Sequence, residues 1–94
     1  MVKINWSKTA LSDLKIIHQF VSKDSILYAD RLINTIVSAV DILENFPLSG
    51  RIVPEKNDEI IREVLKGNYR IFYKIQSPKQ ITVLRVHHSA RNIK

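Results

Sequence analysis

The stretch IIREVLKGNYRIFYKIQSPKQITVLRVH, residues 60–87, contains three strand patterns separated by two turn signals. Gly67-Asn68 favours a tight turn, and Ser77-Pro78-Lys79-Gln80 favours a second one. Consecutive strands joined by such short turns pair in antiparallel fashion, so we expect a three-stranded meander. The predicted strands cover residues 60–65, 69–75 and 81–87.

The middle strand indicates which face of the sheet is buried. Successive side chains of a strand point to opposite faces, so residues 69–75 separate into two sets. One set is aromatic and aliphatic, and we expect helices to cover it. The other set carries two cations, which we expect to remain on the open face. The covered set is Tyr69, Ile71, Tyr73 and Ile75, and the open set is Arg70, Phe72 and Lys74.

The residues before the meander predict one strand and two helices. Residues 2–6 alternate apolar and polar side chains as a half-buried strand does, and Ser7 is a suitable helix N-cap. Apolar residues then recur at helical spacing over residues 9–21 and again over residues 29–43. Because the polar link between these patterns is short, the two helices must run antiparallel and pack as a hairpin.

The expected fold class is therefore α+β, with the order β-α-α-β-β-β. We expect an antiparallel sheet with the two-helix hairpin packed on one face. The 94 residues are too few for two hydrophobic cores, so residues 1–94 are expected to form a single domain.

Composition narrows the class of protein. With 45% hydrophobic and 26% charged residues, the chain has enough apolar surface to fold as a globular domain. It has no cysteine, which excludes a disulfide framework and a thiolate metal site. No stretch approaches the roughly 18 apolar residues of a membrane span. We expect a soluble cytoplasmic protein without a cofactor, and without a metal site because His18 and the late histidines lack a third ligand.

Charge is distributed unevenly along the chain. Residues 1–50 contain five cations and five anions, whereas residues 51–94 contain ten cations and four anions, so the net charge of +6 lies in the second half. No Asp or Glu occurs from Val64 to Lys94. We expect the outward side of the sheet to gather cations that attract phosphate groups or an acidic protein.

Six features in a fixed order resemble a known family. They are the element order itself, Trp6 with Asp13-Leu14, the loop Phe46-Pro47 through Gly50-Arg51 and Pro54-Glu55, Ile61-Arg62-Glu63, the strand Gly67 to Tyr73, and the ending Val86 to Arg91. Together they resemble the RelE/ParE toxin superfamily over nearly the whole chain. The resemblance implies the toxin of a type II toxin–antitoxin pair, held inactive in a hetero-oligomer with its cognate antitoxin protein.

The superfamily has two activities of different classes. ParE-like members inhibit DNA gyrase by protein contact, and RelE-like or YoeB-like members cut messenger RNA, usually on the ribosome, without metal. RNA cleavage requires a base for the attacking ribose 2′-hydroxyl, cations for the developing phosphate charge, and an acid for the leaving oxygen.

The nuclease alternative assigns these roles to five residues. By resemblance Arg70 is the strand arginine that contacts the scissile phosphate, and a guanidinium fork suits that contact. Arg62 would supplement it if the strand register permits. His88 would be the acid, and Glu63 or Glu55 the base.

The ending favours the gyrase-inhibiting branch. Residues 88–91, His-Ser-Ala-Arg, resemble the ParE-like His-Gly-Ala-Arg type, with Ser89 in place of glycine. The lysines and late tyrosine of the RelE pattern are mostly missing. We therefore expect a gyrase inhibitor whose late cations contact its partner, and whose apolar hairpin and sheet edge receive an antitoxin segment. The expected partner contacts are Arg85, Arg91 and Lys94.

Overall fold

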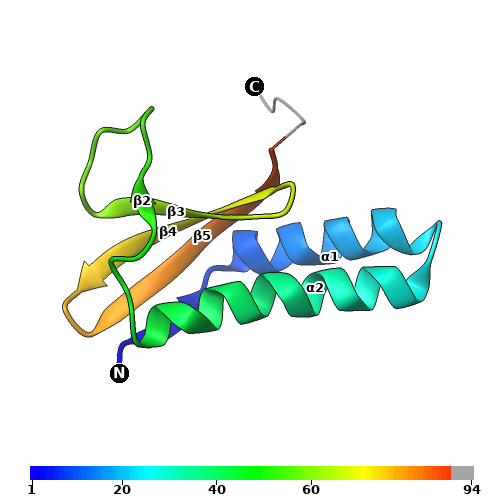
Figure 1. Ribbon diagram of the computed structural model, residues 1–94, viewed down its shortest axis with the longest axis horizontal. Helices are drawn as coiled ribbons and strands as arrows, with labels where there is room; N and C mark the ends of the chain where they lie inside the picture. The colour runs from blue at the N-terminus through cyan, green and yellow to red at the C-terminus, as the bar shows by residue number, and fades with distance from the viewer. Residues whose placement is uncertain (90–94) are drawn as a thin grey trace.

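A helical hairpin covers one face of a five-stranded sheet in the computed structural model, which describes residues 1–89 (Figure 1). The α+β class and the order β-α-α-β-β-β are confirmed, and a two-residue strand, β2, precedes the meander. The elements are β1 (Lys3–Trp6), α1 (Lys8–Ser22), α2 (Ile26–Asp41), the 3-10 helix η1 (Ile42–Glu44), β2 (Arg51–Ile52), β3 (Ile61–Lys66), β4 (Tyr69–Ser77) and β5 (Gln80–His88).

A serine N-cap precedes each of the two long helices. The first backbone N–H groups of a helix have no partner within the helix, and a side-chain oxygen at the N-cap can accept from one of them. Ser7 Oγ accepts from Ala10 N at 3.0 Å, and Ser25 Oγ accepts from Tyr28 N at 3.1 Å. Ser7 Oγ also donates to the Leu84 carbonyl at 3.1 Å. The predicted N-cap is thus confirmed, and it ties the start of α1 to β5.

The core lies between the hairpin and the sheet. Ile71 and Tyr73 of β4 are fully buried, as the alternation in β4 predicts. They pack with Leu14 of α1 and Ile36 of α2 in one cluster. Burying each such side chain stabilises the fold by about 1.5–3 kcal/mol. Figure 1 also shows that the hairpin extends well beyond the β3–β4 turn.

The sheet has the strand order β1-β5-β4-β3-β2 and is mixed. The strands β2 to β5 are antiparallel to their neighbours, as expected, but β1 runs parallel to β5, with Lys3 opposite Gln80 and Trp6 opposite Val83. The expectation of an entirely antiparallel sheet is therefore wrong at β1. Parallel neighbours need a long crossover connection, and the hairpin together with β2 to β4 provides it.

A β-bulge in β5 decides which late side chains face outward. Phe72 is opposite Arg85 and the next residue, Tyr73, is opposite Val83, so Leu84 is an extra residue in β5. The bulge shifts the alternation of β5 by one residue. As a result, His87 is opposite Arg70 on the outer face of the sheet.

Candidate functional site

The outer face of the sheet contains a buried carboxylate between two arginines. Glu63 of β3 is opposite Arg51 of β2, and its side chain is 0% exposed. It accepts a hydrogen bond from Arg51 Nε and another, at 2.7 Å, from Arg70 Nε of β4. Burying a carboxylate is costly unless charged partners satisfy it, and the two guanidinium groups do so here.

Arg70 has a second carboxylate partner on its solvent side. Its Nη1 and Nη2 each donate to Glu55 at 3.2 Å, and its guanidinium lies 4.8 Å from the centre of the Phe72 ring. The hydrogen bonds that Arg70 donates to Glu63 and, to a smaller extent, to Glu55 raise the pKa of Arg70, and the bond from Arg70 lowers the pKa of Glu55. The predicted position of Arg70 on the open face is confirmed, but the guanidinium is paired with two carboxylates.

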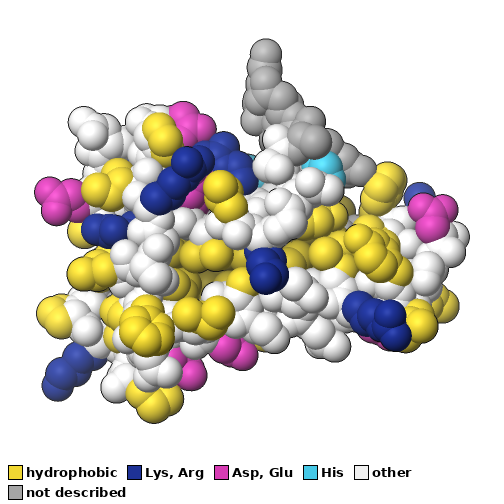
Figure 2. Space-filling model, viewed as in Figure 1, with side chains coloured by type: hydrophobic (Ala, Val, Ile, Leu, Met, Phe, Trp, Pro, Cys, Tyr) yellow, Lys and Arg dark blue, Asp and Glu magenta, His cyan; other side chains and the backbone are white. Residues whose placement is uncertain are grey.

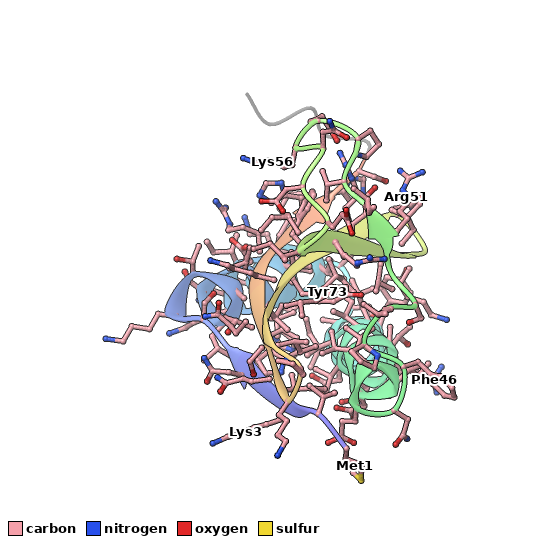
Figure 3. The ribbon with its side chains drawn as sticks, turned by 90° about the vertical axis from the view of Figure 1, so that its left-hand side faces the viewer. Met1, Lys3, Phe46, Arg51, Lys56 and Tyr73 are labelled. Atoms are coloured by element: carbon pink, nitrogen blue, oxygen red, sulfur yellow. The ribbon has the colours of Figure 1, made fainter. Side chains whose placement is uncertain are left out.

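A shallow pocket of ≈ 370 Å³ adjoins this ion cluster. Figure 3 shows Arg51 and Lys56 at the same end of the sheet, with Lys3 at the opposite end. The pocket therefore opens where the β2–β3 loop meets the outer face. Its lining residues are Arg51, Pro54, Glu55, Leu65, Gly67, Arg70 and Ser89.

Arg62 does not join the cluster. It is opposite Tyr73, so it lies on the inner face, and its guanidinium donates to the carbonyl oxygens of Leu48, Gly50 and Glu59. The expectation that Arg62 supplements Arg70 at a phosphate is wrong because the register turns it to the other face. Its hydrogen bonds instead hold the loop before β2.

The two adjacent histidines face opposite sides of β5. His88 is opposite Tyr69, with ring centroids 5.0 Å apart, and so lies on the inner face away from Arg70. His87 lies on the outer face, where its ring is 5.5 Å from Phe72 and its buried Nε2 has no hydrogen-bond partner among residues 1–89. Burial, followed by the charge of Arg85, lowers the pKa of His87. The structure thus places the other histidine of the pair, His87, beside Arg70.

Neither carboxylate expected as a base is free in the structure. Glu63 is enclosed beneath the two arginines, and Glu55, although its side chain is 63% exposed, is bonded to Arg70. The residues expected for RNA cleavage, including His88, are therefore not assembled around one phosphate position. Within residues 1–89, no group of three His, Asp or Glu side chains is placed to hold a metal ion.

Sequence reasoning did not predict the part that Arg51 plays in the cluster. In the sequence, Arg51 stands within a predicted loop, because a two-residue strand is too short to show a period. The opposite charges of Arg51 and Glu63 were a usable signal. Their pairing, however, depends on a β2–β3 register that the sequence does not reveal.

The predicted gathering of cations on one face is only partly observed. Arg85 donates to Asp13 at 2.8 Å and is neutralised by it, and Lys66 and Lys79 lie beside the turns at opposite ends of β4. Figure 2 shows the Lys and Arg side chains spread over several areas, some beside acidic side chains. Arg91 and Lys94 lie outside the described residues.

The hairpin exposes a second kind of surface. A groove of ≈ 370 Å³ separates α2 from the β3–β4 turn; Leu32, Ile36 and Tyr69 contribute apolar lining, and Arg31 and Lys66 contribute charge. Neither α1 nor α2 has the combination of length and hydropathy needed to cross a membrane. Large apolar side chains exposed on the hairpin are Leu11, Ile16, Phe20, Ile26, Leu27 and Tyr28.

Comparisons with known proteins agree with this architecture. The family model described as "ParE toxin of type II toxin-antitoxin system, parDE" matches residues 4–93. A solved chain from the chromosomal ParDE toxin–antitoxin system of P. aeruginosa is 21% identical, with a TM-score of 0.75 over 94% of this chain and 96% of that chain. A chain of the RelBE2 toxin–antitoxin complex from Mycobacterium tuberculosis is 22% identical, with a TM-score of 0.68 over 93% and 96% of the two chains. No curated protein matches the sequence.

Proposed function

The chain belongs to the ParE toxin family of type II toxin–antitoxin systems, and from this membership we propose that it inhibits DNA gyrase by protein contact. A cognate antitoxin protein neutralises it in a hetero-oligomer, and the structurally similar ParDE and RelBE2 chains likewise come from toxin–antitoxin systems. Gyrase as a target places the toxin in the cytoplasm.

The observation that carries this proposal is the pairing of Arg70 with two carboxylates. A nuclease needs an arginine that is free to hold phosphate, next to an acid and a base. In residues 1–89, Arg70 is bonded to Glu55 and Glu63, and His88 lies on the opposite face of the sheet. This arrangement favours a toxin that acts by binding rather than by phosphate chemistry.

The groove between α2 and the β3–β4 turn is the proposed antitoxin site. Its apolar lining is flanked by Arg31 and Lys66, and none of the described residues that line it is acidic. An amphipathic segment with an acidic edge would complement both properties. Such a segment would also cover part of the exposed apolar surface of the hairpin, beginning at Tyr28.

The two parts of this proposal are tested in one gyrase assay. Purified toxin should block supercoiling of relaxed plasmid and leave cleaved DNA, and added antitoxin should restore supercoiling. The variant Leu32→Glu, in the groove, should stay inhibitory but resist the antitoxin, whereas Ile16→Glu, away from the groove, should remain neutralised. Unimpaired supercoiling at saturating toxin would refute the gyrase target, and full neutralisation of Leu32→Glu would refute the groove.

The contacts with gyrase are proposed to involve the late cations. The double variant Arg91→Ala/Lys94→Ala should inhibit about tenfold less well, which corresponds to about 1.4 kcal/mol of binding free energy. The matched control Lys3→Ala/Lys23→Ala removes the same charge elsewhere and should retain its potency. Equal losses in both variants would indicate an effect of net charge alone.

The alternative function, a ribosome-dependent mRNA endoribonuclease, has one supporting observation. His87 lies beside Arg70 on the outer face and is kept neutral by its lowered pKa, as a general base would be. This alternative requires codon-dependent cuts in translated RNA that disappear in Arg70→Ala. Intact message beside inhibited gyrase would reject it.

A further inference from the structure

The two carboxylates bound to Arg70 differ in how easily they can be replaced. The Glu63 side chain is 0% exposed and also holds Arg51, so it is a fixed part of the fold. The Glu55 side chain is 63% exposed. An ion pair made by so exposed a carboxylate competes with water and with other anions.

Glu63 and Phe72 fix the orientation of the Arg70 guanidinium. Its Nε is bonded to Glu63, and its plane lies over the ring of Phe72. Its Nη1 and Nη2 form a fork that donates to Glu55, and Nη2 also lies 2.7 Å from Glu63 Oε1, which holds the fork in place. A fixed fork loses little freedom when it binds a carboxylate through two parallel hydrogen bonds.

Glu55 reaches this fork from a surface turn rather than from the sheet. The turn is closed by hydrogen bonds from Lys56 N and Asn57 N to the Val53 carbonyl, both at 3.1 Å. These bonds do not involve the Glu55 side chain, so it can leave the fork without opening the turn.

We propose that the Arg70 fork and the adjoining pocket bind an acidic side chain of a protein partner, and that Glu55 occupies this position in the free chain. Arg51 and Arg70 are balanced by Glu55 and Glu63, so displacing Glu55 leaves one uncompensated positive charge. One carboxylate matches that charge, whereas a polyanion such as RNA would need several cations. Pro54 and Leu65 add apolar lining that suits a peptide.

This inference rests on the proposed function in one respect, namely that the partner is a protein. The two can fail separately. The fork is tested by binding of a small peptide, whereas the proposed function is tested by gyrase supercoiling. Failure of the peptide to bind would not affect the gyrase result, and failure to inhibit gyrase would not affect the peptide result.

The experiment is a titration of the full-length protein at constant ionic strength. The peptide acetyl-Leu-Glu-Leu-amide, which has one carboxylate, is added while the NMR signal of Arg70 Nε–Hε is followed, and inorganic phosphate is titrated in parallel. In Glu55→Gln the internal competitor is gone, so the peptide should bind about two- to sixfold more tightly than in the wild type. The matched control Glu59→Gln removes the same charge from the same loop but no ligand of Arg70, and its affinity should equal that of the wild type.

Three outcomes would overturn the inference. Unchanged affinity in Glu55→Gln would mean that Glu55 does not compete for the fork. An equal gain in Glu59→Gln would assign the effect to net charge. Tighter binding of phosphate than of the peptide in Glu55→Gln would make the ligand class wrong and would favour the nuclease alternative.

Discussion

The two faces of the central strands β3 and β4 are built on different physical principles. On the inner face, Ile71 and Tyr73 are fully buried against the helices, where apolar packing has no preferred direction. On the outer face, Glu63 is just as buried but depends on Arg51 and Arg70 in specific positions. The inner face is thus determined by composition and alternation, and the outer face by strand register.

The largest effect should come from breaking the outer face at its buried carboxylate. Glu63→Gln keeps the shape of the side chain but leaves Arg70, which is 24% exposed, without its inner anion. Removing one partner of a buried ion pair typically costs about 3–5 kcal/mol, and we expect about 3 kcal/mol because Arg51 remains well hydrated. Urea unfolding would measure the loss.

The matched control for this change is Glu59→Gln. Glu59 is exposed in the loop before β3, so its neutralisation should alter the free energy of unfolding by less than about 0.5 kcal/mol. If the two variants unfold at the same urea concentration, the outer face does not depend on its buried charge.

The inner face was largely predictable from the sequence. The period of two in residues 69–75 correctly identified the buried side of β4, and the helical spacings correctly located both helices. These patterns are local, because each repeats within a few residues of chain. β2 was missed because two residues, Arg51 and Ile52, cannot display a period.

The outer face was predictable only in part, because register is not a local property. The open position of Arg70 follows from alternation within β4, but the inward turn of Arg62 follows from its position opposite Tyr73. Likewise, the extra residue Leu84 has no glycine or proline to signal a bulge, and the bulge selects which histidine faces outward. A shift of one residue in the register of β5 against β4 would exchange the faces of the sheet on which His87 and His88 lie.

A second prediction concerns a polar group on the inner face, the hydroxyl of Tyr73. Tyr73 Oη donates to the Pro47 carbonyl at 2.6 Å and accepts from Gly50 N at 3.1 Å. Tyr73→Phe keeps the packing but leaves two backbone groups without their partner, which should cost about 2 kcal/mol of unfolding free energy. The exposed Tyr28 gives the control: Tyr28→Phe should change stability by less than about 0.5 kcal/mol. Equal effects would mean that the hydroxyl of Tyr73 does not stabilise the loop.

The smallest predicted effect returns to the outer face and concerns pH. Burial, followed by the charges of Arg85 and Arg70, lowers the pKa of His87, and Asp13 opposes them only in part. Between the lowered pKa and the ordinary value of about 6.5, the unfolded chain binds more protons at this residue than the folded chain does. The free energy of unfolding should therefore fall as pH drops below about 6.5, by less than about 1 kcal/mol because solvent screens a partly buried ring.

His87→Gln isolates this contribution, since every other titratable group is present in both proteins and cancels in the difference. Urea unfolding at pH 7.5 and at pH 5.5 should show a smaller loss of stability in the variant than in the wild type. A lowered pKa of His87 can only make the wild type lose more stability than the variant at low pH. If the folded state instead stabilised the cationic form of His87, the wild type would gain stability relative to the variant. Equal losses would show that neither burial nor the charges of Arg85 and Arg70 lower the pKa of His87, and a relative gain for the wild type would show that Asp13 outweighs them.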